Sequence, residues 1–487
     1  ALYQMTDEAL TPEAVLALAR KTETRVLGIE SPRPMLAIPH LLNQESAASY
    51  QGYLLAHMAV YQTRAFFLRQ HGFLTDNTAI GPALATPGVH AVLTADDIPG
   101  QNAVGLEHED QPALAAGVVR YQGEAVALVA ADHPEIARQA AKKIVVEYAL
   151  LEPLTDPRAA LDPASTKVHE GGNVLRHVTI RKGEANPTAP VVVSLDFKVG
   201  MQDQAFLGPE AGLAVPAADG AVDLYVATQW LHADQKQICR ALGLPPEKVR
   251  LTLSGVGGAF GGREDLSMHV HACLLALHTG KPVKMVYNRE ESFFGHVHRH
   301  PATMHYEFGA ERNGKLAYAR AEILLDGGAY ASSTGAVVAN ASTLGLGPYV
   351  FPSVHVDCYG VYTNNPPCGA MRGFGCVQTA FAYEALMDDL ADAVAIDRVA
   401  IRQLNGMTEG DENITGQVID SAAPVAELIQ IVKDMPLPPA VDSDVDVDPG
   451  LLPGGVPNTP HCAGPRRGVS PARPSPTRHR RAARGAT

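Results

Sequence analysis

The segment from Leu251 to Asp265 constrains the fold of this chain more than any other part of the sequence. It reads LTLSGVGGAFGGRED, so that a β-branched run is followed by five glycines within eight residues and then by an apolar stretch with helical spacing. Glycine has no Cβ and tolerates positive φ, which lets backbone N–H groups approach a bound group closely. The pattern predicts a strand, a glycine loop and a helix start, with Glu264 either capping that helix or pointing into a pocket.

The loop fits the known phosphate-binding motifs poorly. Gly257 and Gly262 have P-loop spacing, but Arg263-Glu264 stands where Lys-Ser/Thr is needed to reach phosphate and Mg²⁺. The dinucleotide pattern G-x-G-x-x-G also fails, because Phe260 occupies the place of the third glycine. We therefore disfavour a nucleotide site. A loop that only packs a helix against a strand remains an alternative.

Composition and charge limit the classes of function. A chain of 487 residues with 46% hydrophobic and 19% charged residues fits a globular enzyme of two to four domains. No apolar run reaches the roughly 18 residues that span a bilayer, and the first residues lack a signal-peptide pattern, so we expect no membrane association and a cytoplasmic location. The net charge of −13 argues against nucleic acid as the main partner.

The cysteines indicate that no self-contained metal cluster is encoded. Six are scattered along the chain, without a C-x-x-C pair, at positions 239, 273, 358, 368, 376 and 462. This spacing predicts reduced, mostly buried thiols and does not match the usual iron–sulfur or zinc motifs. A redox centre would have to be bound by other means or supplied by a partner.

The order of local patterns predicts a mixed fold, α+β with α/β parts. We expect five segments, namely a helical segment over 1–82, a small α/β domain over 84–157, a turn-rich linker over 158–194, a longer α/β region over 195–435 and a disordered tail over 436–487.

Several elements inside these segments are predicted individually. Helices are expected at 133–143, at Asp234–Leu242 before Gly243, and at Leu266–His278 before Gly280. The run KIVVEYALLEPL, residues 143–154, has the character of a strand, and Asn313-Gly314 between two strand-like runs predicts a tight hairpin turn.

A histidine run and an arginine turn are further candidates. His296, His298 and His300 alternate, so on a strand they would share one face and could bind a metal. Phe293-Phe294-Gly295 interrupts such a strand and no carboxylate pair follows at ligand spacing, so we favour a structural role. Arg372 lies in CGAMRGFGCVQ, in apolar surroundings that predict a buried guanidinium with a carbonyl or anionic partner. Phe374 beside it could stack on a planar ligand or pack in the core.

Four segments together resemble one family. ATQW at 227–230, GVGGAFGGRED at 255–265 and GAMRGFGCVQ at 369–378 are similar to the molybdopterin-binding subunit of xanthine dehydrogenases, most of all in their bacterial form. YQGEAVALVAADHPEIA at 121–137 resembles the α/β hammerhead domain of the same proteins. The resemblance implies a hammerhead domain at 84–157, followed by the first part of a molybdopterin-binding domain at 195–435.

The resemblance also implies roles for individual residues. Gln229 matches the glutamine that hydrogen-bonds an oxygen ligand of molybdenum, and the metal itself is held through the pterin, without a direct protein ligand. Glu264 matches the glutamate that binds a purine and helps move its protons, Arg372 the arginine beside the cofactor, and Phe374 the aromatic that stacks on the substrate. The implied cofactor-binding residues are Gln229, Gly258, Ala259, Phe260, Gly261 and Arg372.

The reaction implied is hydroxylation of a carbon next to a ring nitrogen, with water as the oxygen source. Electrons would leave through [2Fe-2S] clusters and FAD on partner subunits, in keeping with the scattered cysteines. A carboxylate at Glu264 suits the N–H donors and ring nitrogens of hypoxanthine or xanthine. Purine-using members often carry an arginine where this chain reads VVANASTLGLGPY, with Asn340 and no arginine, so another heterocycle or an aldehyde stays open.

Two departures from the family lead us to expect a truncated or fused product. The family's activating glutamate lies in a C-terminal half that has no counterpart here, and the sequence after PGGVPNTPH becomes rich in Arg and Pro. Residues 1–82 resemble instead the helical part of M3-type zinc oligopeptidases, without a metal motif. The alternatives to an incomplete hydroxylase subunit are a non-catalytic scaffold or assembly protein of the same fold, a purine-binding module, and a peptidase, which rests on the N-terminal segment alone and lacks H-E-x-x-H.

Overall fold

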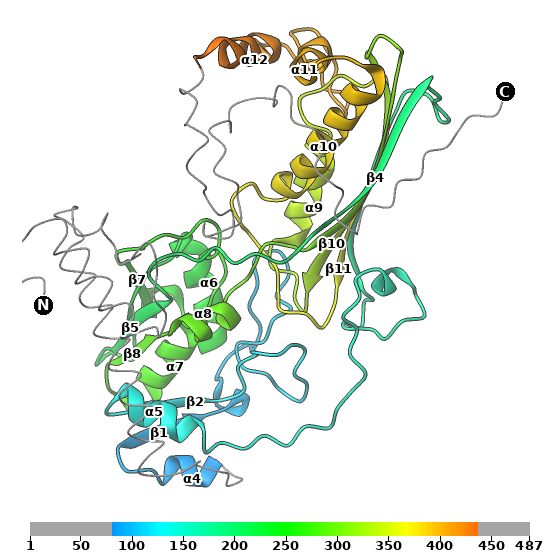
Figure 1. The fold of residues 1–487 in the computed structure, drawn as a ribbon. Helices are drawn as coiled ribbons and strands as arrows, with labels where there is room; N and C mark the ends of the chain where they lie inside the picture. The colour runs from blue at the N-terminus through cyan, green and yellow to red at the C-terminus, as the bar shows by residue number, and fades with distance from the viewer. Residues whose placement is uncertain (1–79, 437–487) are drawn as a thin grey trace, which may run out of the picture. The chain divides into compact units, whose positions relative to one another are not determined.

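The computed structural model describes residues 80–436, which form three β-sheets with helices packed on them (Figure 1). The mixed α and β character predicted from the sequence is confirmed. The helical segment expected over 1–82 and the disordered tail expected over 436–487 lie almost entirely outside the described residues. Within residues 80–436, no helix is both long and apolar enough to cross a membrane.

The first described region contains a two-stranded antiparallel sheet flanked by short helices. Its elements are α4 (Ile80–Leu84), β1 (Val89–Leu93), the 3₁₀ helix η3 (Ala95–Asp97), β2 (Leu128–Ala131) and α5 (Pro134–Ala141). The predicted helix at 133–143 is confirmed as α5. It begins where it does because Pro134 suits a first helical position and the His133 ring accepts from the Glu135 N–H at 3.2 Å.

The strand expected at 143–154 is wrong. These residues form no regular structure, and Leu150 and Leu151 are 94% and 74% exposed. A strand needs a neighbour to receive its backbone hydrogen bonds, and no described strand lies beside this run. An apolar sequence alone does not make this run a strand.

The linker expected over 158–194 is also wrong in part. The segment holds the 3₁₀ helix η4 (Ala159–Leu161) and turns, but also β3 (Val174–Lys182) and the start of β4 (Val191–Val199). β3 pairs antiparallel with β11 (Ser353–Tyr362), so that Lys182 lies opposite Val354. The partner that makes this segment a strand is far away in the sequence, where local composition cannot reveal it.

The larger sheet has five strands in the order β3-β11-β10-β9-β4. β9 (Ala302–Ala310) and β10 (Leu316–Gly328) form an antiparallel hairpin, and the predicted turn at Asn313-Gly314 is confirmed, with Gly314 at φ 84°. β10 and β11 are parallel and are connected through α9 (Thr334–Thr343). α9 and α10 (Cys376–Val394) pack on this sheet and complete its core (Figure 1).

The smaller sheet has four strands in the order β7-β6-β5-β8, and it carries the glycine loop. The strands are β5 (Ala211–Pro216), β6 (Val222–Val226), β7 (Val249–Leu253) and β8 (Val283–Val286). β6 and β7 are parallel and are joined through α6 (Leu231–Leu242) and the 3₁₀ helix η5 (Pro246–Lys248). The predicted helix ending at Gly243 is confirmed, because Gly243 adopts the left-handed conformation that closes α6.

Helix α7 (His269–Thr279) follows the glycine loop. It ends at Gly280 as predicted but begins three residues later than the expected Leu266. α7 and the small sheet share one hydrophobic core with β1 and β2, so that Leu93 and Leu128 lie in the same cluster as Leu224 and Leu275. The remaining helices are α8 (Arg289–Gly295), α11 (Arg398–Asn405) and α12 (Val425–Asp434).

The five described cysteines are free thiols, as the sequence predicts. Four of them are buried and Cys376 is partly buried. Burial raises the pKa of the Cys273 thiol to about 12, so this group stays protonated and packs as a small apolar side chain.

Candidate functional site

The glycine loop runs from the end of β7 to the start of α7 and takes a path that few residues other than glycine can follow. Gly257, Gly258 and Gly261 have φ values of 64°, 100° and 103°, and Phe260 between them has φ 54°. A Cβ built on Gly261 would lie 2.6 Å from the carbonyl carbon and oxygen of Ala370. Glycine at 261 therefore lets the loop lie directly against the turn that contains Arg372.

Gln229, just after β6, ties this loop together through its side chain. Its Oε1 accepts from the N–H groups of Gly261 at 3.0 Å and Arg263 at 3.3 Å. Its Nε2 donates to Glu264 Oε1 at 3.3 Å. Two backbone donors on one oxygen fix the orientation of the carboxamide, so its NH₂ group faces Glu264 and keeps a second hydrogen for a ligand.

Glu264 does not cap a helix. α7 begins only at His269, and the Glu264 N–H donates to the carbonyl of Gly261 at 3.2 Å within the loop. The side chain lies against Gln229 instead, and its burial raises the pKa of the carboxyl, an effect that the Gln229 hydrogen bond opposes. Of the two alternatives for this residue, the cap is excluded.

Further carboxyl groups lie behind Glu264, and sequence reasoning missed them. Burial raises the pKa of Asp265 to about 7, against a hydrogen bond from the Ser332 hydroxyl at 2.9 Å, and the charges of Glu264, Asp234 and Asp110 add to the rise. Burial likewise raises the pKa of Asp234 to about 7. Asp110 and Asp234 are distant in the sequence, and only the fold brings them here.

Arg263 supports the loop from inside the protein. This side chain is buried, and its guanidinium donates to the carbonyls of Gly258 at 3.0 Å, Ala227 at 3.5 Å and Gly208. It also lies 4.3 Å from the centre of the Phe206 ring. The only sequence signal was its position next to Glu264, directly after the last glycine of the loop.

The expectation of a buried guanidinium at Arg372 is wrong. Arg372 is exposed and sits on a turn next to Gly373, which has φ 93°. The backbone of Arg372, and not its side chain, connects this turn to the glycine loop and to Arg299. Its N–H donates to the Phe260 carbonyl at 2.8 Å, and its carbonyl accepts from Arg299 Nη2 at 2.8 Å. The buried arginines of this region are Arg263 and Arg299.

Phe374, on the same turn, is partly buried and packs against the core of the five-stranded sheet. Its backbone has φ 46°, and its N–H closes the turn on the Met371 carbonyl at 2.8 Å. The sequence left open whether Phe374 stacks on a ligand or packs in the core. In the structure, part of its ring packs in the core.

The outer surface of the loop suits a flat, oxygen-rich ligand. Within residues 80–436, the N–H groups of Gly258, Ala259 and Phe260 donate to no protein acceptor. Phe260 and the nearby Trp230 are 50% and 46% exposed, which is unusual for side chains of this size. Free backbone donors beside apolar rings can bind phosphate or pterin oxygens and cover a heterocycle.

Comparisons with known proteins agree with this geometry. Residues 168–406 match the family described as molybdopterin cofactor-binding domain, and residues 77–152 match the aldehyde oxidase and xanthine dehydrogenase a/b hammerhead domain. The chain is 37% identical to the nicotinate dehydrogenase large molybdopterin subunit of Eubacterium barkeri, over 73% of this chain and 84% of that protein. It is also 37% identical to a probable xanthine dehydrogenase subunit of Bacillus subtilis, over 65% of this chain and 43% of that protein.

A solved structure with the same architecture is the aldehyde oxidoreductase of Desulfovibrio gigas. It superposes with a TM-score of 0.69 at 30% identity, over 73% of this chain and 41% of that protein. The chain thus spans most of the Eubacterium barkeri subunit and less than half of the other two relatives. The resemblance drawn from the sequence motifs is confirmed. The chain belongs to the molybdenum hydroxylase family, as a molybdopterin-binding subunit of the kind found in xanthine dehydrogenases.

Proposed function

We propose that this chain carries the molybdopterin side of an oxidoreductase that hydroxylates a purine, hypoxanthine or xanthine, or a related N-heterocycle, with water as the oxygen source. The observation that supports this most directly is the Gln229–Glu264 pair. It places a carboxyl of raised pKa, able to share a proton with a ring nitrogen, beside the donors of the glycine loop.

The residues present fit molybdopterin. The N–H groups of Gly258, Ala259 and Phe260, which have no acceptor among residues 80–436, are donors for its oxygens, and Gln229 keeps a hydrogen for an oxygen ligand. The cofactor, when bound, supplies two-electron oxidation and an activated water-derived oxygen. The exposed Arg372 side chain stands beside the same loop as a cation for an anionic part of the cofactor.

Glu264 would orient the heterocycle and hold a proton that moves to or from a ring nitrogen as the carbon beside it is oxidised. Gln229 donates to Glu264 and thereby keeps its carboxylate facing the loop. The exposed part of the Phe374 ring is the surface on which the heterocycle would stack.

Electrons would leave to an iron–sulfur subunit and an FAD-binding subunit. Two relatives are themselves named as subunits, and the Eubacterium barkeri large molybdopterin subunit is matched over most of its length. These names support a complex in which further chains carry the electrons onward.

The test uses the complex purified with the subunits encoded beside it. Molybdenum content and kcat/KM are measured with hypoxanthine, xanthine, nicotinate and benzaldehyde. We expect N-heterocycles to be turned over, and Glu264→Gln to lower kcat/KM for them by about 10²- to 10⁴-fold. The turnover of benzaldehyde should change far less, because an aldehyde has no ring nitrogen for Glu264 to hold.

Three results would contradict the proposal. A loaded complex that oxidises benzaldehyde and no N-heterocycle would exclude the substrate class. A complex that contains no molybdenum would favour the scaffold alternative. Equal losses with both substrate classes in Glu264→Gln would show that Glu264 acts on the cofactor and not on the heterocycle.

A further inference from the structure

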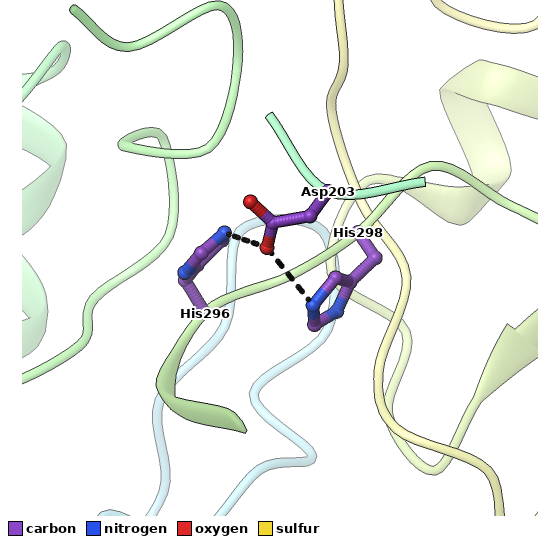
Figure 2. A group of neighbouring side chains, drawn as sticks. All are labelled: Asp203, His296 and His298. Carbon is purple, nitrogen blue, oxygen red and sulfur yellow. Dashed lines mark ion pairs between the residues drawn. The ribbon is translucent and has the colours of Figure 1, made fainter. Parts of the chain in front are cut away.

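A buried group of two histidines and two carboxylates lies behind the loop, away from the Gln229–Glu264 pair. Asp203 lies between β4 and β5, while His296 and His298 follow α8 (Figure 2). The side chains of His296 and His298 are 1% and 6% exposed, and that of Asp203 is 16% exposed. The function proposed above gives no role to any of them.

The two imidazoles converge on a single carboxylate oxygen. Asp203 Oδ2 lies 3.0 Å from His296 Nε2 and 3.3 Å from His298 Nε2, as Figure 2 shows. The three atoms lie within 4.8 Å of one another, close enough for small side-chain adjustments to bring them onto one metal ion. The other Asp203 oxygen, Oδ1, accepts from the Ala205 N–H at 2.6 Å, and this contact orients the carboxylate.

Hydrogen bonding does not account for this convergence. Asp203 Oδ2 and both ring nitrogens of His296 are buried and make no aligned hydrogen bond within the described residues, despite their short separations. A histidine that lies at hydrogen-bond distance from a carboxylate without pointing an N–H at it is unusual in a protein interior. Atoms arranged around a shared cation have this kind of geometry.

Glu210 contacts the far side of the His296 ring, as a carboxylate outside the ligand set does in many metal sites. Its Oε1 lies 2.9 Å from His296 Nδ1, and its side chain is 3% exposed. The Glu210 carboxylate would favour a proton on Nδ1 through its charge, without an aligned hydrogen bond, and this would leave the lone pair on Nε2, the nitrogen nearest Asp203. Carboxylate–histidine–metal chains fix the ligand tautomer in this way.

We propose that Asp203, His296 and His298 bind a divalent transition metal ion of the zinc class, with Glu210 orienting His296. Imidazole is a borderline ligand, so a set of two imidazoles and one carboxylate suits Zn²⁺ and its neighbours better than Mg²⁺ or Ca²⁺. His300, the third member of the histidine run, takes no part, because its Nε2 lies 2.9 Å from the Thr334 hydroxyl.

The ion would join the segment around Asp203 to the segment around His298, and both contact the glycine loop or the Arg372 turn. Gln204, next to Asp203, donates to the Ala370 carbonyl at 2.7 Å, and its side chain would meet a Cβ at Gly262 at 3.0 Å. The His298 carbonyl accepts from the Gly369 N–H at 2.9 Å. The site therefore fixes the rear of the glycine loop and of the Arg372 turn, and its role is structural.

The experiment uses the full chain without a polyhistidine tag, stripped with a chelator and then dialysed against ZnCl₂. Metal content and thermal stability are compared for the wild type, His298→Ala, Asp203→Asn and the control His305→Ala, whose imidazole forms an exposed pair with Asp196 at 2.7 Å. We expect about one zinc ion per chain and a Tm raised by several degrees in the wild type and the control. Both effects should be lost in His298→Ala and Asp203→Asn.

Cobalt substitution in the wild type provides a readout that does not depend on how the variants fold. Co²⁺ bound to nitrogen and oxygen gives visible d–d bands without the near-ultraviolet charge-transfer bands of thiolate ligation. Thiolate bands, or zinc retained equally by His298→Ala, would place any bound metal elsewhere and overturn the proposal. So would a wild type that takes up no zinc and shows no change in Tm, which would leave His296 as an imidazolium between two carboxylates.

Discussion

Gln229 connects Glu264 to the backbone of the glycine loop through one carboxamide, which donates to Glu264 Oε1 at 3.3 Å and accepts from the Gly261 N–H at 3.0 Å. The position of the acid and the shape of the loop therefore depend on the same group. Oε1 serves the loop and Nε2 serves the acid, so substitutions can separate the two effects.

Replacing Gln229 by Ala or by Glu should affect stability and activity differently. Gln229→Ala leaves the N–H groups of Gly261 and Arg263 without an acceptor, at a cost of about 1–3 kcal/mol for each one that stays buried. Gln229→Glu keeps an acceptor but loses the donor that faces Glu264. We expect Gln229→Glu to melt closer to the wild type than Gln229→Ala, while both lower kcat/KM by about 10²-fold. Equal Tm values for the two variants would contradict this division of roles.

The raised pKa of Glu264 predicts an acid limb in the activity profile. Burial makes the carboxyl retain its proton above its ordinary pKa of 4.5. The carboxylate, the form of Glu264 that can take a proton from the heterocycle, is therefore lost as the pH falls through the raised value. We expect kcat/KM for xanthine to decline on the acidic side with a midpoint above 4.5, and the residual activity of Glu264→Gln to lack that limb. A limb unchanged in the variant would assign the titration to another group.

Gly261 should not tolerate a side chain, whereas Gly255 in the same loop should. A Cβ at Gly261 would lie 2.6 Å from the Ala370 backbone, in a conformation with φ 103°. A Cβ at Gly255 would have no atom within 4 Å. Gly261→Ala should lower the Tm by several degrees and reduce molybdenum content in the complex, while Gly255→Ala leaves both near the wild-type values. Similar behaviour of the two variants would show that the Gly261–Ala370 approach is not required.

Asp234 should make stability depend on pH. Burial raises its pKa from 3.8 to about 7, against the hydrogen bond from Thr228. An acid with a higher pKa in the folded chain binds its proton more tightly when folded, so its contribution to stability falls as the pH rises from about 4 to about 7. Asn cannot ionise. The Tm of Asp234→Asn relative to the wild type should therefore increase by several degrees between about pH 5 and 8, measured by differential scanning fluorimetry. A constant difference would show that Asp234 stays ionised.

Local signals were sufficient for part of the fold. Gly243 and Gly280 end the helices that the sequence predicts, and Asn313-Gly314 forms the expected hairpin turn. The glycine loop could also be recognised from sequence, since so many positive φ angles in succession require glycine. These features depend on residues close together in the chain.

The errors concern contacts between distant residues. β3 is a strand because β11 lies beside it, and 143–154 is not one because no described strand does. No carboxylate pair follows the histidine run at ligand spacing in the sequence, yet Asp203 and Glu210 reach it from about ninety residues upstream. Arg263 escapes sequence reasoning because its acceptors are carbonyls, which leave no trace in a sequence pattern.

The core that α7 shares with β1 and β2 couples these two strands to the glycine loop that leads into α7. Excising them would leave the apolar side of α7 in water, and the loop that leads into this helix would lose its anchor. The two regions should therefore unfold as a single cooperative unit and resist separate expression. In engineering or in evolution, a change of substrate made by exchanging the loop would have to carry the hammerhead strands with it.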